Sequence, residues 1–183
     1  MPRLIHLNGP PGIGKSTLAC RYAADHPLAF SLDIDSIRRL IGHWNEQEQE
    51  SGKLARRMAL AMSAAHLAGG HDVVIPQYVA RPGFVRALAA VAERLNVEFY
   101  EIVLMDAVDA AEARFTARDE DPELQAHHRE ALRMIGRDGG FRGMYERLVQ
   151  ALQELPAPIL IQTQAGDVDG SYSRILSAVT RTA

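Results

Sequence analysis

Short apolar runs alternate along the chain with longer stretches in which apolar residues recur every three or four positions. The short runs predict five strands, at Leu4–Leu7, Ala29–Leu32, Val73–Pro76, Glu98–Met105 and Pro158–Gln162. Because these runs lack strict alternation of apolar and polar residues, we expect both faces of the strands to be covered. The repeated order of strand and helix is typical of an α/β fold, with a parallel sheet, helices on both faces and right-handed crossovers.

The longer stretches predict amphipathic helices between the strands. Their apolar faces are Leu54, Met58, Ala61 and Ala65; Phe84, Leu88, Val91 and Leu95; and Tyr172, Ile175, Leu176 and Val179. The segment Asp119–Gly143 differs, because it is polar, charged and rich in glycine near its end. We interpret it as a lid at about residues 119–143, with a helix from about Pro122 to Arg137.

The composition fits one globular domain that covers residues 1–183. The chain is 47% hydrophobic and has a formal net charge of −3, which gives no whole-chain attraction to nucleic acid or to anionic membranes. It contains neither a signal segment nor an apolar run long enough to span a membrane. Its single cysteine, Cys20, excludes an internal disulfide and is expected to be buried on the first helix. We expect a cytoplasmic monomer or homodimer with no membrane partner and no extended nucleic-acid binding.

The segment from Gly9 to Thr17 reads GPPGIGKST and fits the pattern Gly-x-x-x-x-Gly-Lys-Ser between a predicted strand and a predicted helix. Glycines let the backbone approach phosphate oxygens, and successive N–H groups at a helix N-terminus bind anions. Lys15 is expected to reach the β- and γ-phosphates, and the Ser16 hydroxyl to complete a magnesium shell. The predicted nucleotide-binding residues are Gly9, Gly12, Ile13, Gly14, Lys15, Ser16 and Thr17.

A charged segment, SLDIDSIRR, follows the second predicted strand at residues 31–39. Because the carboxyl ends of parallel strands share one edge of a sheet, this segment should lie at the same edge as the phosphate loop. Asp33 and Asp35 point to one side if the chain is still extended, and Asp35 is a suitable N-cap for the helix that carries Arg38. A helix cap with solvated charges is one interpretation of this segment, and half of an active site is the other. Arg39 is expected to be a surface residue.

Together, these motifs resemble the P-loop kinases of nucleosides and other small molecules, in particular adenylylsulfate kinase, chloramphenicol phosphotransferase, polynucleotide 5′-kinase and the zeta-toxin kinases. The resemblance implies a three-layer P-loop NTPase fold with five parallel strands in the order 2-3-1-4-5, and ATP and Mg²⁺ as cofactors. In these kinases the second strand ends in an Asp followed three residues later by an Arg, as Asp35 and Arg38 are here. The resemblance implies that Asp35 accepts the proton of the substrate hydroxyl. It also implies that Asp33 orients magnesium or its water shell and that Arg38 holds the acceptor.

Arginines four residues apart continue into the predicted lid. Arg114 and Arg118 match the Arg-x-x-x-Arg of the kinase lid, which implies that they stabilise charge on the transferring phosphoryl group. A second stripe with the same spacing consists of Arg129, Arg133 and Arg137. Glu123 and Glu130 could instead pair with these arginines and make them ordinary surface charges.

The third predicted strand departs from the family pattern. It ends in the neutral Pro76 and Gln77, where many relatives carry an Asp of the magnesium shell, so magnesium would rely on Ser16, Asp33 and water. The residues expected to line the acceptor pocket are Gln77, Tyr78, Arg81 and Trp44, the last of which could equally be a packing residue. The loop after the last strand is expected near adenine, with candidates Gln162, Thr163 and Gly166.

Two functions follow from these features. The first is an ATP-dependent phosphotransferase that acts on a hydroxyl of a small molecule such as a nucleoside, a sugar or an antibiotic. The second is a nucleotide-binding regulatory switch with little or no kinase activity, which the neutral end of the third strand favours. The guanine-reading pattern Asn-Lys-x-Asp is absent from the sequence, which argues against a signalling GTPase.

Overall fold

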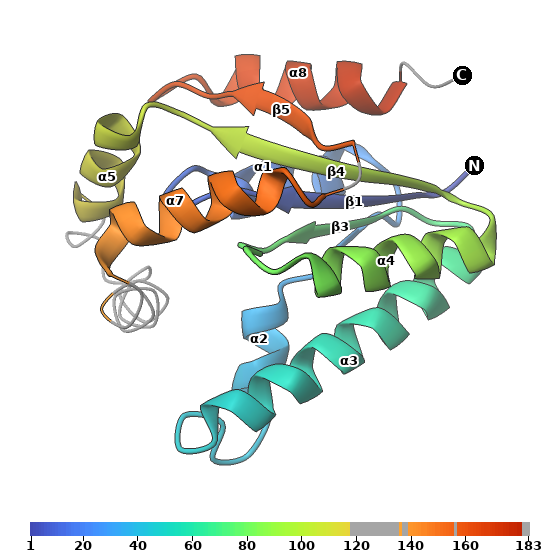
Figure 1. The fold of residues 1–183 in the computed structure, drawn as a ribbon. Helices are drawn as coiled ribbons and strands as arrows, with labels where there is room; N and C mark the ends of the chain where they lie inside the picture. Colours follow the sequence, from blue (N-terminus) through green and yellow to red (C-terminus); the bar gives the residue numbers. More distant parts are fainter. Residues whose placement is uncertain (118–135, 137–138, 156, 181–183) are drawn as a thin grey trace.

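The computed structural model describes residues 1–117, 136, 139–155 and 157–180 (Figure 1). Its strands form one parallel sheet in the order β2-β3-β1-β4-β5, which confirms the predicted order. The strands are β1 (Arg3–Asn8), β2 (Phe30–Ser31), β3 (Val73–Pro76), β4 (Glu98–Met105) and β5 (Ile159–Gln162). The bounds of β3 and β4 match the predicted runs, whereas β2 is shorter than Ala29–Leu32.

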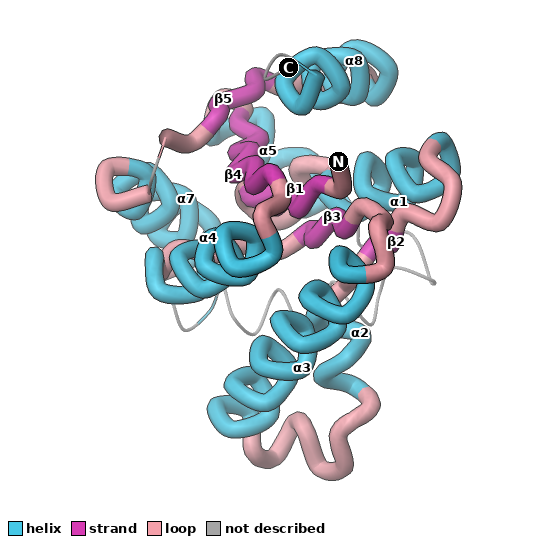
Figure 2. Tube along the Cα trace, turned by 90° about the vertical axis from the view of Figure 1, so that its right-hand side faces the viewer, coloured by secondary structure: helices cyan, strands magenta, loops and turns pink. Residues whose placement is uncertain are grey.

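Helices cover both faces of this sheet. They are α1 (Lys15–Asp25), α2 (Ile34–Arg39), α3 (Glu48–Ala68), α4 (Pro82–Leu95), α5 (Val108–Thr116), α7 (Gly140–Leu152) and α8 (Val168–Thr180). Figure 2 shows α1 and α8 on one side of the strands and α4 and α7 on the other, with α2 and α3 beyond the β2 end. The three layers confirm the predicted fold class.

Neighbouring residues of the central strands belong to different parts of the core. Leu4 of β1 packs in a cluster with α3 and α4, whereas Ile5 packs in a cluster with α1 and α8. In the same way Val73 and Ile75 of β3 belong to the first cluster and Val74 to the second. Successive side chains of a strand point to opposite faces, so a strand that is buried on both faces must be apolar at every position. This explains the unbroken apolar runs of the sequence.

The predicted apolar face of α3 is wrong, because Leu54, Met58, Ala61 and Ala65 are all exposed. The buried face instead contains small residues, among them Gly52, Ala55 and Ala59. Helix α3 packs against both α2 and α4, and small side chains let neighbouring helices approach closely. The close approach of α2 and α4, and not the hydrophobicity of the side chains, therefore determines which face of α3 is buried. The faces predicted for α4 and α8 are confirmed, since their central residues are buried.

The prediction that Cys20 is buried is also wrong. Helix α1 buries Leu18, Ala19 and Tyr22, and this face leaves Cys20 exposed to solvent. In the part of the chain that the structure describes, no helix has the length and apolar character needed to cross a membrane.

Candidate active site

The phosphate loop joins β1 to α1 and depends on glycine at two close contacts. Gly9 has φ of 143°, and a Cβ atom there would lie 2.6 Å from the carbonyl oxygen of Leu104. Gly12 has φ of 84°, and its Cβ would lie 3.1 Å from the Cα atom of Phe115 in α5. Side chains are excluded by both the positive φ and the contacts, so the backbone itself forms the surface of the loop.

The first turn of α1 supplies the polar groups expected of a phosphate site. Lys15 begins the helix, and its Nζ atom donates hydrogen bonds to the carbonyl oxygens of Gly9 (2.8 Å) and Pro10 (2.9 Å). Ser16 and Thr17 are exposed in the same turn. A helix N-terminus carries unpaired N–H groups and partial positive charge, so this end of α1 attracts anions. The structure thus brings the predicted residues Gly9 to Thr17 together around one helix terminus.

A buried polar network supports the base of this loop. The imidazole of His6 contacts Glu101 through Nδ1 (2.5 Å to Oε2), and its Nε2 lies 3.0 Å from the carbonyl oxygen of Gln77. Asn8 donates through Nδ2 to Glu101 (3.1 Å) and to the carbonyl oxygen of Val79 (2.9 Å). All three side chains are buried. The network joins β1 and β4 to the segment after β3, so it fixes that segment beside the phosphate loop.

In the charged segment after β2, helix α2 begins two residues earlier than predicted. Asp33, not Asp35, is the N-cap, because its Oδ1 accepts from the Asp35 N–H (3.0 Å). The Asp33 Oδ2 atom accepts from the Ser36 hydroxyl (2.5 Å) and lies 3.6 Å from the Arg39 guanidinium. Helix α2 buries its first residue, Ile34, which draws the helix start into the core. Arg39 is therefore half-buried and paired rather than an ordinary surface residue.

Asp35 is the titratable group whose setting best suits proton transfer. Burial raises the pKa of its carboxyl group, and the neighbouring charge of Asp33 raises this pKa further. Arg39 and Arg38 oppose this rise in pKa, as does a hydrogen bond with the Gln77 side chain. A carboxylate with a raised pKa is a stronger base than an exposed one and so accepts a proton more readily near neutral pH.

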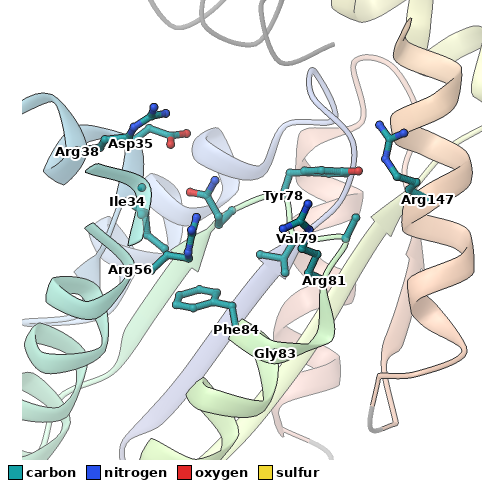
Figure 3. A pocket seen from close by; sticks show the side chains of 13 residues that line it. Ile34, Asp35, Arg38, Arg56, Tyr78, Val79, Arg81, Gly83, Phe84 and Arg147 are labelled. Atoms are coloured by element: carbon teal, nitrogen blue, oxygen red, sulfur yellow. The ribbon is translucent and has the colours of Figure 1, made fainter. Parts of the chain in front are cut away.

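A cavity of about 540 Å³ opens at this edge of the sheet (Figure 3). Its volume lies in the range of about 300–1,000 Å³ that small-molecule sites occupy. The apolar part of its wall includes Ile34, Tyr78, Val79 and Phe84, and the charged part consists of Asp35, Arg38, Arg56, Arg81 and Arg147. The cavity therefore combines a surface for an organic ligand with a concentration of guanidinium groups.

Most of the residues predicted for the acceptor side line this cavity. They are Asp35, Arg38, Gln77, Tyr78 and Arg81. The Tyr78 hydroxyl donates to the carbonyl oxygen of Met144 in α7 (2.9 Å), which ties the cavity wall to that helix. Trp44 does not line the cavity. Its ring instead lies 5.2 Å from the Arg38 guanidinium, which also donates to the Ser51 hydroxyl (3.1 Å) at the start of α3.

Two arginines of the cavity were not predicted, namely Arg56 of α3 and Arg147 of α7. Both lie inside helices with other charged residues nearby, so the local sequence does not distinguish them from arginines that line no cavity. A Cβ atom on Gly52 would lie 3.6 Å from the Arg56 guanidinium, which is an ordinary van der Waals contact, so this glycine is no signal for the arginine.

The predicted lid arginines are only partly described. Arg114 forms an ion pair with Asp106 at the end of β4, and its neighbour Phe115 packs against Gly12 of the phosphate loop. Helix α5 therefore lies against the loop, as a lid helix would. Arg118, Arg129, Arg133 and Arg137 lie outside the described residues, as does the predicted helix from Pro122 to Arg137.

The candidates near adenine differ in their surroundings. The Thr163 N–H and hydroxyl both donate to the carbonyl oxygen of Met105 (2.7 and 3.1 Å), so this buried residue closes the end of the β4–β5 pair. Gln162 is exposed, and Gly166 has φ of 77° in the following loop. Exposed Gln162 and the Gly166 turn are accessible to a ligand, whereas the polar atoms of Thr163 serve the fold.

A magnesium ion would find few protein ligands here. No cluster of three or more His, Cys, Asp or Glu side chains suited to a metal occurs among the described residues. Mg²⁺ commonly keeps several waters and binds through substrate phosphates with one or two protein groups. The exposed Ser16 hydroxyl at the phosphate loop fits this requirement. Asp33 already accepts hydrogen bonds on both oxygens within α2, so it suits contact through a water molecule.

Comparison with known proteins agrees with this geometry. A family model described as an AAA domain matches residues 4–137. The chain matches no curated protein.

Three solved structures are similar over nearly the whole chain. The tunicamycin resistance protein of Deinococcus radiodurans has a TM-score of 0.63 at 17% identity, covering 98% of this chain and 96% of that chain. The APS kinase of Mycobacterium tuberculosis, in complex with AMPPNP and APS, has a TM-score of 0.60 at 14% identity and covers 98% of each chain. A gluconokinase from Sinorhizobium meliloti has a TM-score of 0.53 at 15% identity, covering 98% and 96%. The resemblance to P-loop kinases is thereby confirmed, and at these identities it establishes the fold.

Proposed function

Because the chain belongs to the AAA domain family and folds as P-loop kinases do, we propose that it transfers the γ-phosphate of ATP to a hydroxyl group of a small molecule. One observation supports this most strongly. Asp35, a carboxyl group with a raised pKa, lines a ligand-sized cavity at the sheet edge that also carries the phosphate loop. A switch protein needs the phosphate loop, but it does not need a base beside an additional, ligand-sized cavity.

In this proposal the two substrates approach each other along the sheet edge. The phosphate loop and Lys15 hold the β- and γ-phosphates, and Ser16 binds the magnesium ion, with Asp33 acting through its water shell. Magnesium supplies charge neutralisation on the phosphates when it is bound. Asp35 accepts the proton of the acceptor hydroxyl as the new O–P bond forms. The bond between the γ-phosphorus and the bridging oxygen breaks, and ADP leaves with that oxygen.

The remaining predicted residues take supporting roles. Gln77, the neutral residue at the end of β3, orients Asp35 through the side-chain hydrogen bond between them. Arg114 approaches the transferring phosphoryl group once its ion pair with Asp106 opens. Arg118, which is four residues later in the sequence, has the same proposed role. The guanidinium groups then stabilise negative charge on the phosphoryl oxygens.

The regulatory switch remains the second candidate. Two observations favour it: β3 ends without an acidic residue, and Arg114 is paired with Asp106 rather than directed at a phosphate. A switch would bind ATP or GTP, and the bound nucleotide would alter the affinity for a protein partner.

The test is transfer of label from [γ-³²P]ATP to a library of hydroxylated metabolites. We expect wild type to label at least one acceptor, and we expect Asp35→Asn to lose about 10²–10⁴-fold in rate while retaining AMPPNP affinity. Glu50→Gln, which changes an exposed acid at the start of α3, is the matched control and should keep full activity. A wild type that binds AMPPNP but labels no acceptor, or an Asp35→Asn variant as fast as wild type, would contradict the proposed transfer.

A further inference from the structure

The cavity beside Asp35 has a charge that is opposite to the charge of the whole chain. Four arginines and one aspartate line it, while the chain has a formal net charge of −3. Guanidinium groups stay protonated in proteins, so this excess of positive charge cannot be relieved by loss of a proton. Such a concentration of guanidinium groups attracts anions.

Two of these arginines have no hydrogen-bonding or ionic partner among the residues that the structure describes. Arg38 donates hydrogen bonds to the Ser51 hydroxyl and to the carbonyl oxygen of Glu48 at the start of α3. Arg56 and Arg81, in contrast, form no hydrogen bond or ion pair with any residue that the structure describes. Burial lowers the pKa of the Arg56 guanidinium, and the charges of Arg38 and Arg81 lower this pKa further, which shows that the three guanidinium groups are close to one another.

Both side chains are exposed to solvent and line the wall of the cavity, so a ligand can reach them. Gly52 lies beside the Arg56 guanidinium at the cavity wall. Arg81 is the N-cap of α4, whose free N–H groups add partial positive charge at the same place. Figure 3 shows the ring of Phe84 below the Arg56 side chain in the view, and Phe84 lines the same cavity. An anionic group would be held there above an apolar surface, where electrostatic attraction is stronger than in water.

The charged residues of the cavity come from different elements. Figure 3 shows Asp35 with Arg38 at the α2 end, whereas Arg56 and Arg81 approach from α3 and from the start of α4. Val79 and Phe84 supply apolar surface to the same wall. A ligand that spans the cavity can therefore place a hydroxyl at Asp35 and a charged group at the guanidinium pair.

We propose that the acceptor is a hydroxylated small molecule that carries a fixed anionic group (a phosphate, sulfate or carboxylate), and that Arg56 and Arg81 bind this group. The inference rests on the proposed phosphotransferase function and defines its substrate class. Guanidinium groups form paired hydrogen bonds with each of these anions, so the three share one recognition chemistry.

The first experiment measures anion binding without turnover. Calorimetric titration with inorganic phosphate, sulfate and acetate is carried out with the phosphate loop saturated by AMPPNP and Mg²⁺. We expect at least one anion to bind wild type, and we expect Arg56→Met and Arg81→Met to weaken it at least tenfold. Arg57→Met removes an exposed arginine next to Arg56 that does not line the cavity, and it should bind the anion as wild type does.

The second experiment identifies the anion through catalysis. Hydroxylated compounds are supplied as matched sets of a neutral parent and its anionic members, such as glycerol with glycerol 3-phosphate and glycerate. We expect labelling from [γ-³²P]ATP to be at least tenfold faster for the anionic members, and the Arg56→Met variant to lose this preference through a higher KM. Neutral parents labelled as fast as their anionic members, or anion binding equal in wild type and Arg56→Met, would overturn the inference. If the anion binds and no acceptor is labelled, the phosphotransferase function fails instead.

Discussion

The buried network under the phosphate loop allows a quantitative test through Glu101. Its side chain is 1% exposed and its two oxygens contact His6 and Asn8. Replacing Glu101 by Leu leaves His6 Nδ1 and one Asn8 Nδ2 hydrogen buried without a partner. Each unsatisfied buried group costs about 1–3 kcal/mol, so Glu101→Leu should lower the free energy of unfolding by roughly 2–6 kcal/mol. For a chain of this size that corresponds to a fall in Tm of roughly 10 °C.

A matched substitution separates hydrogen bonding from charge. The carbonyl oxygen of Gln77 is only an acceptor, so His6 Nε2 must carry a proton to bond with it. In Glu101→Gln the new amide can donate to His6 Nδ1 and accept from Asn8 Nδ2, which gives both of these groups a partner again. We expect this variant to lose less than about 1 kcal/mol.

Both variants can be measured by urea unfolding followed by circular dichroism, with linear extrapolation of the free energy of unfolding. The reasoning is refuted if Glu101→Leu lies within about 0.5 kcal/mol of wild type, which is the range of ordinary surface substitutions. It is also refuted if Glu101→Gln destabilises the protein as much as Glu101→Leu, because the loss of stability would then not depend on the number of buried groups without a partner.

Three further predictions concern single positions. Because burial and Asp33 raise the pKa of Asp35 above its ordinary value of 3.8, the folded protein binds this proton more tightly than the unfolded chain, and stability falls as pH rises between the two pKa values. Asp35→Asn should therefore have a higher Tm than wild type at pH 7–8, and calorimetric scans should show this advantage shrinking toward pH 4; an advantage independent of pH would contradict the shift. Gly12→Ala should weaken AMPPNP binding at least tenfold and cost about 1–3 kcal/mol, because φ is positive and the Cβ meets Phe115, whereas Gly42→Ala has open space and should be neutral in the same calorimetric titration. The thiol of Cys20 should react stoichiometrically with a coloured disulfide reagent in the native protein, and slow reaction that requires urea would contradict its exposure.

The fold was predictable because its signals are local. The phosphate loop, the strand runs and the helix that follows Gly14 are each encoded within a few residues, and the resemblance to P-loop kinases that they carry implies the strand order. The same holds for the acidic segment after β2, although the helix cap is Asp33 rather than Asp35. The difference depends on Ile34, which is drawn into a core that the local sequence does not reveal.

Features that depend on distant contacts were not predictable. The buried face of α3 consists of small residues because α2 and α4 lie close to it, and no property of Leu54 or Met58 indicates that they are exposed. Arg56 and Arg147 approach one cavity from helices that are more than 70 residues apart in the described chain. Periodicity places such residues on helices, but it does not determine which helices meet.

The network under the phosphate loop also has a thermodynamic consequence. A single atom, the Oδ1 of Asn8, accepts the N–H of Gly9 (2.8 Å) on the nucleotide side and the N–H of Val79 (2.9 Å) in the wall of the acceptor cavity. If the phosphate loop moves and its hydrogen bond to this oxygen changes, the preferred position of the segment at Val79 changes as well, and the reverse also holds. Nucleotide and acceptor should therefore bind with a coupling free energy between them. By linkage, each ligand then changes the affinity for the other by the same factor.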